Sequence, residues 1–354
     1  MEIQRYPSDN NKPIPPDDEL DFGKFTTDHM FLMEYAPHRG WSNPRIEGYR
    51  NISLDPAAMV LHYNQEVFEG LKAFCLAGDG IALFRPMQNI ERFNYSARRL
   101  VMPEIEPDVF LNAVRELVLM DRQWVPSSSG TSLYIRPTMI ATEPALGVRP
   151  AREYLFYIIA GPVGTYYREG FSPTRIYVTD TYVRAVQGGT GEAKTSSNYG
   201  PTLLAFQDAK EKGFDQVLWL DAKEKKYVEE VGTSNIFFVI GESLITPPLS
   251  GTILHGVTRD SVLQLAKHWG ITADEQPISM DEIIAAHRAG ELREVFATGT
   301  AAVISPVGEL FYQGHAFTIG HGEAGPLSQR LYEEISGIQN GTRKDEFGWL
   351  YHVT

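Results

Sequence analysis

The sequence contains a single cysteine, Cys75, among 354 residues. An intramolecular disulfide and a zinc site built on several thiolates are therefore excluded. No apolar run reaches the roughly 18–20 residues that cross a bilayer, and the first residues lack the basic start and apolar stretch of a signal peptide. Basic residues are outnumbered, 32 Lys and Arg against 45 Asp and Glu, and the formal net charge of −13 argues against nucleic-acid binding. We expect a cytoplasmic protein with neither a nucleic-acid nor a membrane partner.

The composition is otherwise that of a large globular protein. Hydrophobic residues make up 43% of the chain, enough to bury a substantial core, and at roughly 150 residues per domain the length predicts two domains. Glycine, proline and aromatic residues crowd into 161–173 without periodicity. We therefore predict a smaller α+β domain at 1–160, an interdomain loop at 161–173 and a larger domain at 174–354. The first 20 residues contain four prolines and are expected to form an extended arm.

Hydrophobic periodicity predicts a mixed fold, because segments with a period near 3.6 residues occur among segments rich in β-branched and aromatic residues. The helical segments lie at about 89–100, from 107 onward, 201–212, 257–269, 280–289 and 325–337. The strand segments lie at about 61–63, 81–84, 132–136, 154–159, 216–220, 235–240 and 293–297.

The densest glycine cluster, 188–195, nearly matches the phosphate loop G-x-x-x-x-G-K-[ST] of nucleoside triphosphatases. It matches at the first glycine, at Lys194 and at the threonine that follows. Ala193, however, places a β-carbon where the loop needs a glycine, and Glu192 would put a carboxylate among phosphates. Asp221 follows an apolar strand segment and would be the magnesium ligand in this reading. An NTPase is therefore the remote alternative.

Lys194 can instead act as an amine nucleophile. Lysine forms Schiff bases with carbonyl cofactors, above all pyridoxal phosphate. Such a site needs a partner for the phenolic oxygen, which Tyr199 could supply, and an acid for the ring nitrogen. Glu230, at the end of a short strand before a glycine, could keep that nitrogen protonated. The helix expected from Val257 offers backbone N–H groups, and Thr258 a hydroxyl, to the phosphate.

Two further segments could complete the phosphate site. Small donors follow a predicted strand at 298–302, and Arg92 could add charge-assisted contacts from the first domain. The nine histidines show no ligand spacing, so no metal site is expected.

Taken together, these residues resemble the branched-chain amino-acid aminotransferases of fold type IV, whose two-domain fold is that of D-amino-acid aminotransferase. The resemblance runs from about Tyr63 to Asn340. It rests on three linked blocks, E-x-G-x-x-N-I-F at 230–237, L-I-T-P-P at 244–248 and L-x-G-V-T-R at 254–259, and also on 68–74 and 83–86 in the first domain.

The resemblance implies transamination of L-leucine, L-isoleucine and L-valine with 2-oxoglutarate. Lys194 would be the catalytic residue that bonds to pyridoxal 5'-phosphate and moves the proton. The implied cofactor residues are Arg92, Lys194, Tyr199, Glu230, Thr233, Leu254, Val257, Thr258 and Thr300. An apolar substrate pocket would be lined by Tyr63, Phe68, Tyr134, Val148, Tyr166 and Ala302. Arg136 would meet the distal carboxylate of glutamate, and the N–H groups of Ala301 and Ala302, helped by Thr233, would hold the α-carboxylate.

Other interpretations remain open at this point. The aromatic residues of the pocket could serve only in core packing, and Arg136 could belong to a surface or domain-interface salt bridge. The loop that carries Val148 would, by the resemblance, reach the neighbouring subunit's pocket, which implies a homodimer or a larger homo-oligomer. Ala302 and Ser305 stand where some animal members carry a Cys-x-x-Cys redox switch, so none is expected here.

The alternatives within the same fold are a D-amino-acid aminotransferase and an aminodeoxychorismate lyase. The Tyr134-x-Arg136 pair and the long N-terminal part favour the branched-chain enzyme. A pure interaction module would leave the lysine, the acid and the phosphate site unexplained.

Overall fold

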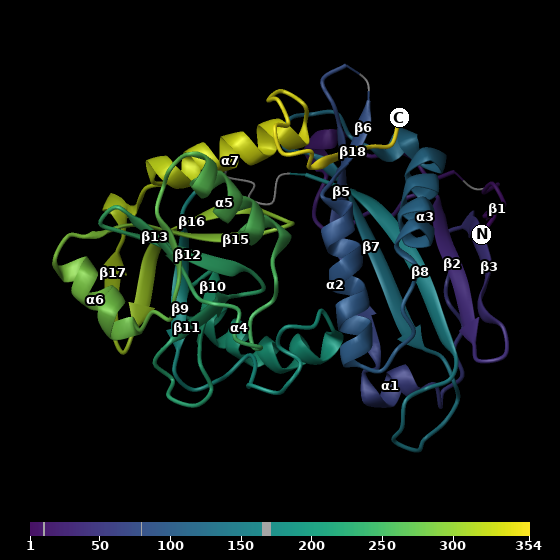
Figure 1. Ribbon diagram of the computed structural model, residues 1–354, viewed down its shortest axis with the longest axis horizontal. Helices are drawn as coiled ribbons and strands as arrows, with labels where there is room; N and C mark the ends of the chain where they lie inside the picture. The colour runs from purple at the N-terminus through teal and green to yellow at the C-terminus, as the bar shows by residue number, and fades with distance from the viewer. Residues whose placement is uncertain (10, 79, 165–170) are drawn as a thin grey trace. The chain divides into compact units, whose positions relative to one another are not determined.

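The computed structural model describes residues 1–9, 11–78, 80–164 and 171–354 (Figure 1). They form two compact units. The first comprises Met1–Tyr166, Ala193–Ser196 and Gly337–Thr354, and the second comprises Tyr167–Glu192 and Ser197–Ser336. Each unit is built on a nine-stranded sheet with helices, so the predicted mixed fold class is confirmed. The contiguous division at 161–173 stays a prediction.

The sheet of the first unit has the strand order β1-β3-β2-β8-β7-β5-β6-β18, with β4 beside β7. All its strand pairs are antiparallel except β1 with β3. The longest pairing joins β7 and β8 along ten residues each, where β-branched and aromatic residues favour the extended chain. The strands are β1 (Gln4–Arg5), β2 (His29–Ala36), β3 (Gly40–Gly48), β4 (Glu66–Phe68), β5 (Leu71–Cys75), β6 (Ile81–Phe84), β7 (Ser132–Ala141), β8 (Tyr154–Val163) and β18 (Leu350–His352).

Two long helices pack on this sheet, α2 (Pro86–Arg99) and α3 (Pro107–Met120), as Figure 1 shows. Each begins with proline, whose fixed φ suits the first helical position. Their buried faces meet the sheet through Phe93, Phe110 and Phe156, whose ring centroids lie 5.0–5.5 Å apart. The short elements are α1 (Met59–Tyr63), η1 (Asp17–Glu19) and η2 (Arg122–Trp124).

The prediction of a strand at 61–63 is wrong, because these residues form the end of α1. A run of three apolar or aromatic residues does not distinguish a strand from a helical turn. Asn64, with φ 50°, ends the helix in the left-handed conformation, which asparagine tolerates better than most residues.

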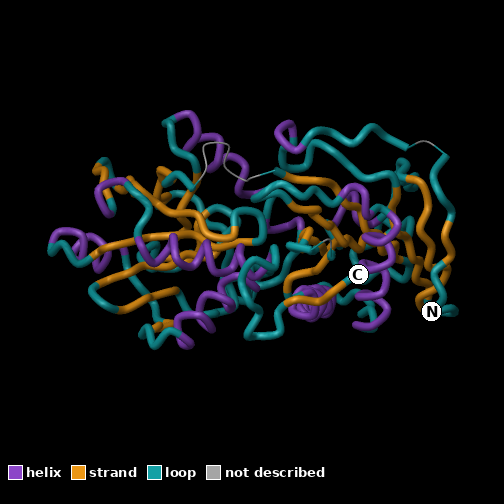
Figure 2. The backbone as a smooth tube through the Cα atoms, turned by 90° about the horizontal axis from the view of Figure 1, so that it is seen from above, coloured by secondary structure: helices purple, strands orange, loops and turns teal. Residues whose placement is uncertain are grey.

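The N-terminal arm lies along the edge of the first sheet (Figures 1 and 2). Beyond β1, the Tyr6 N–H donates to the Ile46 carbonyl at 2.8 Å. The Ser8 N–H donates to His29 Nε2 at 2.9 Å. Lys12 Nζ then donates to the Thr27 carbonyl at 2.7 Å. These bonds anchor the proline-rich arm to the first sheet.

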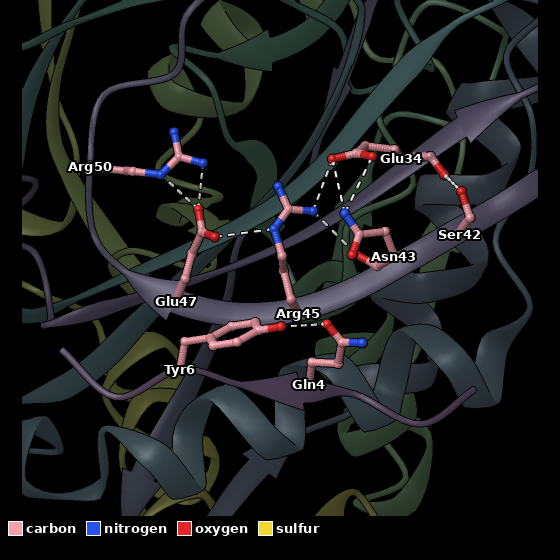
Figure 3. Close-up of polar contacts among 8 residues, drawn as sticks. All are labelled: Gln4, Tyr6, Glu34, Ser42, Asn43, Arg45, Glu47 and Arg50. Carbon is pink, nitrogen blue, oxygen red and sulfur yellow. Dashed lines mark hydrogen bonds and ion pairs between the residues drawn. The ribbon is translucent and has the colours of Figure 1, made fainter.

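An ion-pair network covers the exposed side of β2 and β3 (Figure 3). Arg45 lies between two carboxylates, with Nη1 2.9 Å from Glu34 and Nε 3.1 Å from Glu47. Arg50 contacts Glu47 from the other side at 2.6 Å. Because the Glu34 side chain is 40% exposed, its pair with Arg45 contributes little to stability.

The sheet of the second unit has the order β11-β10-β9-β16-β15-β12-β13-β14, with β17 beside β16. Its strands are β9 (Thr174–Thr179), β10 (Gln216–Leu220), β11 (Val228–Val231), β12 (Asn235–Ile240), β13 (Ser243–Thr246), β14 (Ala273–Glu275), β15 (Leu292–Gly299), β16 (Val303–Tyr312) and β17 (His315–Thr318). Its helices are α4 (Leu203–Glu211), α5 (Val257–His268), α6 (Met280–Arg288) and most of α7 (Pro326–Gln339), with the turns η3 (Ser196–Asn198), η4 (Gly200–Thr202) and η5 (Gly320–Gly322). Among the described helices, none is long and apolar enough to cross a membrane.

Candidate active site

Lys194 belongs to a four-residue segment, Ala193–Ser196, that is part of the first unit. Its backbone is held on both sides. The Lys194 N–H donates to Ser96 Oγ at 2.9 Å, and its carbonyl accepts the Phe68 N–H at 3.0 Å. The Nζ atom lies 5.0 Å from the centroid of the Phe68 ring, a cation–π distance. The lysine is therefore fixed at its backbone by α2 and β4, while its side chain is half-buried.

Beside this segment lies a buried ion pair between Glu69 and Arg92. Arg92 donates through Nε at 2.7 Å and through Nη2 at 2.9 Å, and Asn89 adds a bond of 2.9 Å from α2. Burial alone would raise the pKa of the Glu69 carboxyl, but the Arg92 charge and these hydrogen bonds, with a contribution from the Lys194 charge, lower it below 4.5. Arg92 is thus oriented by Glu69; its predicted phosphate contact stays a prediction.

Three predicted substrate residues lie together in the first unit. Arg136 Nη2 donates to the Tyr134 hydroxyl at 2.9 Å, and the guanidinium carbon lies 4.7 Å from the Phe68 ring centroid. Gly70 permits this arrangement, since a β-carbon there would lie 2.1 Å from the Tyr134 hydroxyl oxygen. Within the described chain, the buried Nε of Arg136 has no hydrogen-bond partner. Such an atom is suited to an anionic ligand.

Two other first-unit candidates lie close to an exposed loop: Tyr63 ends α1, and Val148 lies on the loop itself. The Tyr63 hydroxyl donates to the Leu146 carbonyl. Leu146 and Val148 are 65% and 84% exposed, values that are high for aliphatic side chains. Tyr166 lies outside the described residues. The predicted contact of Val148 with another subunit is not tested by a single chain.

Glu230 is a buried candidate of the second unit, and both of its carboxylate oxygens have partners. It lies on β11, is 2% exposed, and its Oε1 accepts the Leu254 N–H at 2.9 Å and Asn235 Nδ2 at 3.1 Å. Its Oε2 lies 2.8 Å from Nε of Arg184. These three contacts hold the Glu230 carboxylate in one orientation. A partner for a protonated ring nitrogen requires such a fixed carboxylate.

The start of α5 is tied to the same carboxylate. Asn235 Nδ2 also donates to the Leu254 carbonyl at 2.9 Å. A β-carbon at Gly256 would lie 1.9 Å from Asn235 Oδ1, so only glycine fits there. The helix begins at Val257, and its N-cap residue, Gly256, has no side chain with which to cap the first N–H groups. This buried helix end, with Thr258 in its first turn, is suited to a phosphate.

Two turns that carry further candidates lie at the same end of two neighbouring strands of the second sheet, β12 and β15. Because β12 pairs with β15 at Asn235 and Thr298, the turn that holds Thr233 neighbours the turn that holds Thr300, Ala301 and Ala302. The buried Oγ1 of Thr298 has no hydrogen-bond partner among the described residues. Strand pairing thus groups the predicted α-carboxylate residues with Thr300.

The structure favours the interpretation of Lys194 as an amine nucleophile over its interpretation as the lysine of an NTPase phosphate loop. No helix begins at Lys194, and the next α-helix of the described chain, α4, starts at Leu203. Asp221 accepts backbone N–H groups from four residues of the following turn, including Glu224 at 2.7 Å and Tyr227 at 2.8 Å. This carboxylate therefore closes a hairpin turn. Nor do the described residues hold a group of three or more His, Cys, Asp or Glu that could bind a metal ion.

The predicted residues fall into both units, each of which is described by itself. Those of the first are Tyr63, Phe68, Arg92, Tyr134, Arg136, Val148 and Lys194, and those of the second are Tyr199, Glu230, Thr233, Leu254, Val257, Thr258, Thr300, Ala301 and Ala302. Tyr199 precedes η4, where its carbonyl accepts from Thr202 Oγ1 at 2.7 Å.

Sequence reasoning missed three supporting residues, Glu69, Arg184 and Asn235. Glu69 and Asn235 stand inside the recognised blocks, where only a motif and not a contact marks them. Arg184 lies ten residues before Lys194, and no local pattern distinguishes it from a surface arginine.

Comparison with known proteins identifies the family of the chain. The family described as Amino-transferase class IV matches residues 66–310, and the chain belongs to it. The predicted family is thereby confirmed. The chain is 54% identical over 342 residues to branched-chain-amino-acid aminotransferase 2 of Bacillus subtilis (strain 168), covering 97% of this chain and 94% of that protein. It is 52% identical over 352 residues to branched-chain-amino-acid transaminase 1 of the same organism, covering 99% of both.

A solved structure has the same fold. The branched-chain amino acid aminotransferase of Escherichia coli is 26% identical, with a TM-score of 0.75 over 92% of this chain and 99% of that one.

Proposed function

We propose that the protein is a pyridoxal-phosphate-dependent aminotransferase that exchanges the amino group between L-leucine, L-isoleucine or L-valine and 2-oxoglutarate. The observation that carries the proposal is the fixed Lys194 segment, bonded to Ser96 and Phe68, in a class IV chain. Identities of 52–54% to branched-chain enzymes over nearly the whole chain support the substrate class.

The residues present fit the cofactor. A buried helix end with Thr258 suits its phosphate, Glu230 suits its ring nitrogen, and Lys194 is an amine beside an aromatic ring. Bound pyridoxal phosphate supplies a carbonyl to which amines add and a ring that takes up the electron pair released at the substrate Cα.

Each of the candidate side chains has a distinct role in the transamination reaction. Lys194 Nζ takes the proton from the substrate Cα and delivers it to C4′ of the cofactor. The contacts of the Lys194 backbone with Ser96 and Phe68 limit the positions that this amine can reach. Tyr199 holds the phenolic oxygen. Arg92 and Thr300 add to the phosphate site, and Leu254 packs on the ring.

Substrate selection is assigned to both units. Tyr63, Phe68, Tyr134, Val148, Tyr166 and Ala302 form an apolar wall for branched side chains. Arg136 binds the distal carboxylate of glutamate or 2-oxoglutarate, which its buried, unpartnered Nε supports within the described chain. The N–H groups of Ala301 and Ala302, with Thr233, bind the α-carboxylate. We also propose a cytoplasmic homodimer or larger homo-oligomer, in which the exposed Val148 loop lies against another subunit.

The test is Lys194→Ala, with the exposed Lys210→Ala on α4 as matched control. Loss of the proton-transferring amine should lower kcat for L-leucine and 2-oxoglutarate by about 10²–10⁴. The control should keep full activity, and both variants should keep the wild-type circular dichroism. Normal turnover by Lys194→Ala would overturn the mechanism. Turnover of D-alanine but not of L-leucine by the wild type would overturn the substrate class alone.

A further inference from the structure

One buried side chain that the proposed function does not use, Arg184, connects three segments of the second unit around Glu230. Its Nε lies 2.8 Å from Glu230 Oε2, and its side chain is only 8% exposed. Nε is not aligned for a hydrogen bond with any acceptor of the described chain, so this contact is electrostatic. A guanidinium this close supplies the positive charge that a buried carboxylate needs.

The same guanidinium also holds the backbone near Glu230. Its Nη2 donates to the carbonyls of Gly191, at 3.0 Å, and Thr252. These two segments approach so closely that a β-carbon on Gly191 would lie 2.6 Å from the Thr252 oxygen. Two residues after Thr252, the Leu254 N–H donates to Glu230 Oε1. Arg184 therefore contacts one carboxylate oxygen directly and restrains the other through the backbone of 252–254.

A second buried carboxyl, Glu229, precedes Glu230 on β11 and has a hydrogen-bond partner of its own. Neighbouring residues of a strand point to opposite faces, and Glu229 Oε1 accepts from Thr252 Oγ1 at 2.6 Å. Burial raises the pKa of Glu229, and the Thr252 bond and the Arg184 charge offset this only in part. The Nε atom of Arg184 thus contacts Glu230, whereas the Glu229 carboxyl accepts its hydrogen bond from Thr252.

We propose that Arg184 is a positioning residue, which fixes the charge and orientation of the Glu230 carboxylate for a protonated ring nitrogen. The inference rests on the proposed function. A protonated ring N–H opposite a fixed carboxylate forms a charge-assisted hydrogen bond with it, whereas a C–H in the same place does not. Arg184 should therefore determine how well the protein distinguishes pyridoxal phosphate from its carbocyclic analogue, in which a C–H replaces the ring nitrogen.

The experiment titrates the apo-protein with each compound and follows quenching of tryptophan fluorescence. The measured quantity is the ratio of the two dissociation constants in the wild type, Arg184→Gln, Arg184→Lys and Glu229→Gln. The ratio should fall about tenfold in Arg184→Gln. It should stay within about threefold in Arg184→Lys, which keeps the charge, and in Glu229→Gln, which changes the neighbouring carboxyl of the same network.

The outcomes separate the inference from the proposed function. An equal loss of affinity for both compounds in Arg184→Gln would show a merely structural role and overturn the inference, as would an equal fall of the ratio in Glu229→Gln. If Arg184→Gln does not fold, Arg184→Lys decides. A tenfold fall of the ratio of dissociation constants in Arg184→Lys would mean that the positive charge does not determine the discrimination, and would overturn the inference. A wild type that binds both compounds equally overturns the inference but leaves cofactor binding intact. A wild type that binds neither overturns the proposed function.

Discussion

The buried Glu69–Arg92 pair beside Lys194 offers a sharp test of how the first unit is stabilised. Both Glu69 oxygens are used, with donors from Arg92, Asn89 and the Gly70 N–H at 2.7–3.0 Å, and the side chain is wholly buried. Glu69→Gln removes the charge but keeps the shape, and it removes the buried carboxylate that pairs with the Arg92 guanidinium. Breaking a buried pair by removal of one partner costs about 3–5 kcal/mol in the free energy of unfolding.

The assay is urea unfolding at neutral pH, with Glu34→Gln as matched control. Glu34 also pairs with an arginine, Arg45, at 2.9 Å (Figure 3), but the Glu34 side chain is 40% exposed. Its loss should therefore cost about 1 kcal/mol or less. The Glu69 variant should show a lower midpoint with an unchanged m value.

The pH dependence gives a second, independent criterion. The pKa of Glu69 lies below its ordinary 4.5 in the folded protein. The carboxylate therefore contributes stability that is present above 4.5 and is lost as the pH falls through the folded pKa. The difference in the free energy of unfolding between the wild type and Glu69→Gln should therefore become smaller as the pH falls below 4.5. The reasoning is refuted if Glu69→Gln costs no more than Glu34→Gln, or if the difference is the same at pH 7 and pH 3.

Two more predictions concern Lys72, through the pH dependence of stability, and Arg136, through the affinity for 2-oxoglutarate. Burial lowers the pKa of Lys72 on β5 to about 8, so between pH 8 and 10.5 the unfolded chain binds a proton that the folded chain does not. Wild-type stability should rise with pH across that window relative to Lys72→Met, by at most ~1.4 kcal/mol per pH unit; parallel pH curves for the two proteins would contradict this. Arg136→Met should raise KM for 2-oxoglutarate about 10–100-fold, because a hydrogen bond to a charged group contributes roughly 1.5–3 kcal/mol, and should change KM for L-leucine little. Steady-state kinetics with Tyr134→Phe as control check this, and an equal rise in both KM values would disprove the assignment.

The sequence predicted well what depends on local periodicity and on residue type. The helices at α2, α3 and α5 and the strands β7, β8 and β12 begin or end within a few residues of their predicted bounds. Proline at the first position of α2 and α3 is a local signal that needs no tertiary contact. Glu230 was predicted as an acid at a strand end before a tight glycine, and Gly232 does adopt φ 57°.

What could not be predicted depends on contacts between distant segments. Ser96 bonds the Lys194 N–H from 98 residues away, and the Arg184–Thr252 bond spans 68 residues. No spacing rule links such pairs, because tertiary packing alone brings them together. The strand expected at 61–63 failed for the opposite reason, since three residues carry too little periodicity to identify any element.

The discontinuous first unit has a consequence for the order of folding during synthesis. Its sheet is completed by β18, where Tyr351 pairs with Leu83 of β6, and its lysine segment lies at 193–196. A ribosome that adds 5–20 residues per second needs roughly 10–40 s between the end of β8 and the arrival of β18. Throughout that interval β6 exposes an unpaired edge, and the second unit emerges in full. The unit that is synthesised first is therefore completed last, and its open edge is a place where other strands can pair during synthesis.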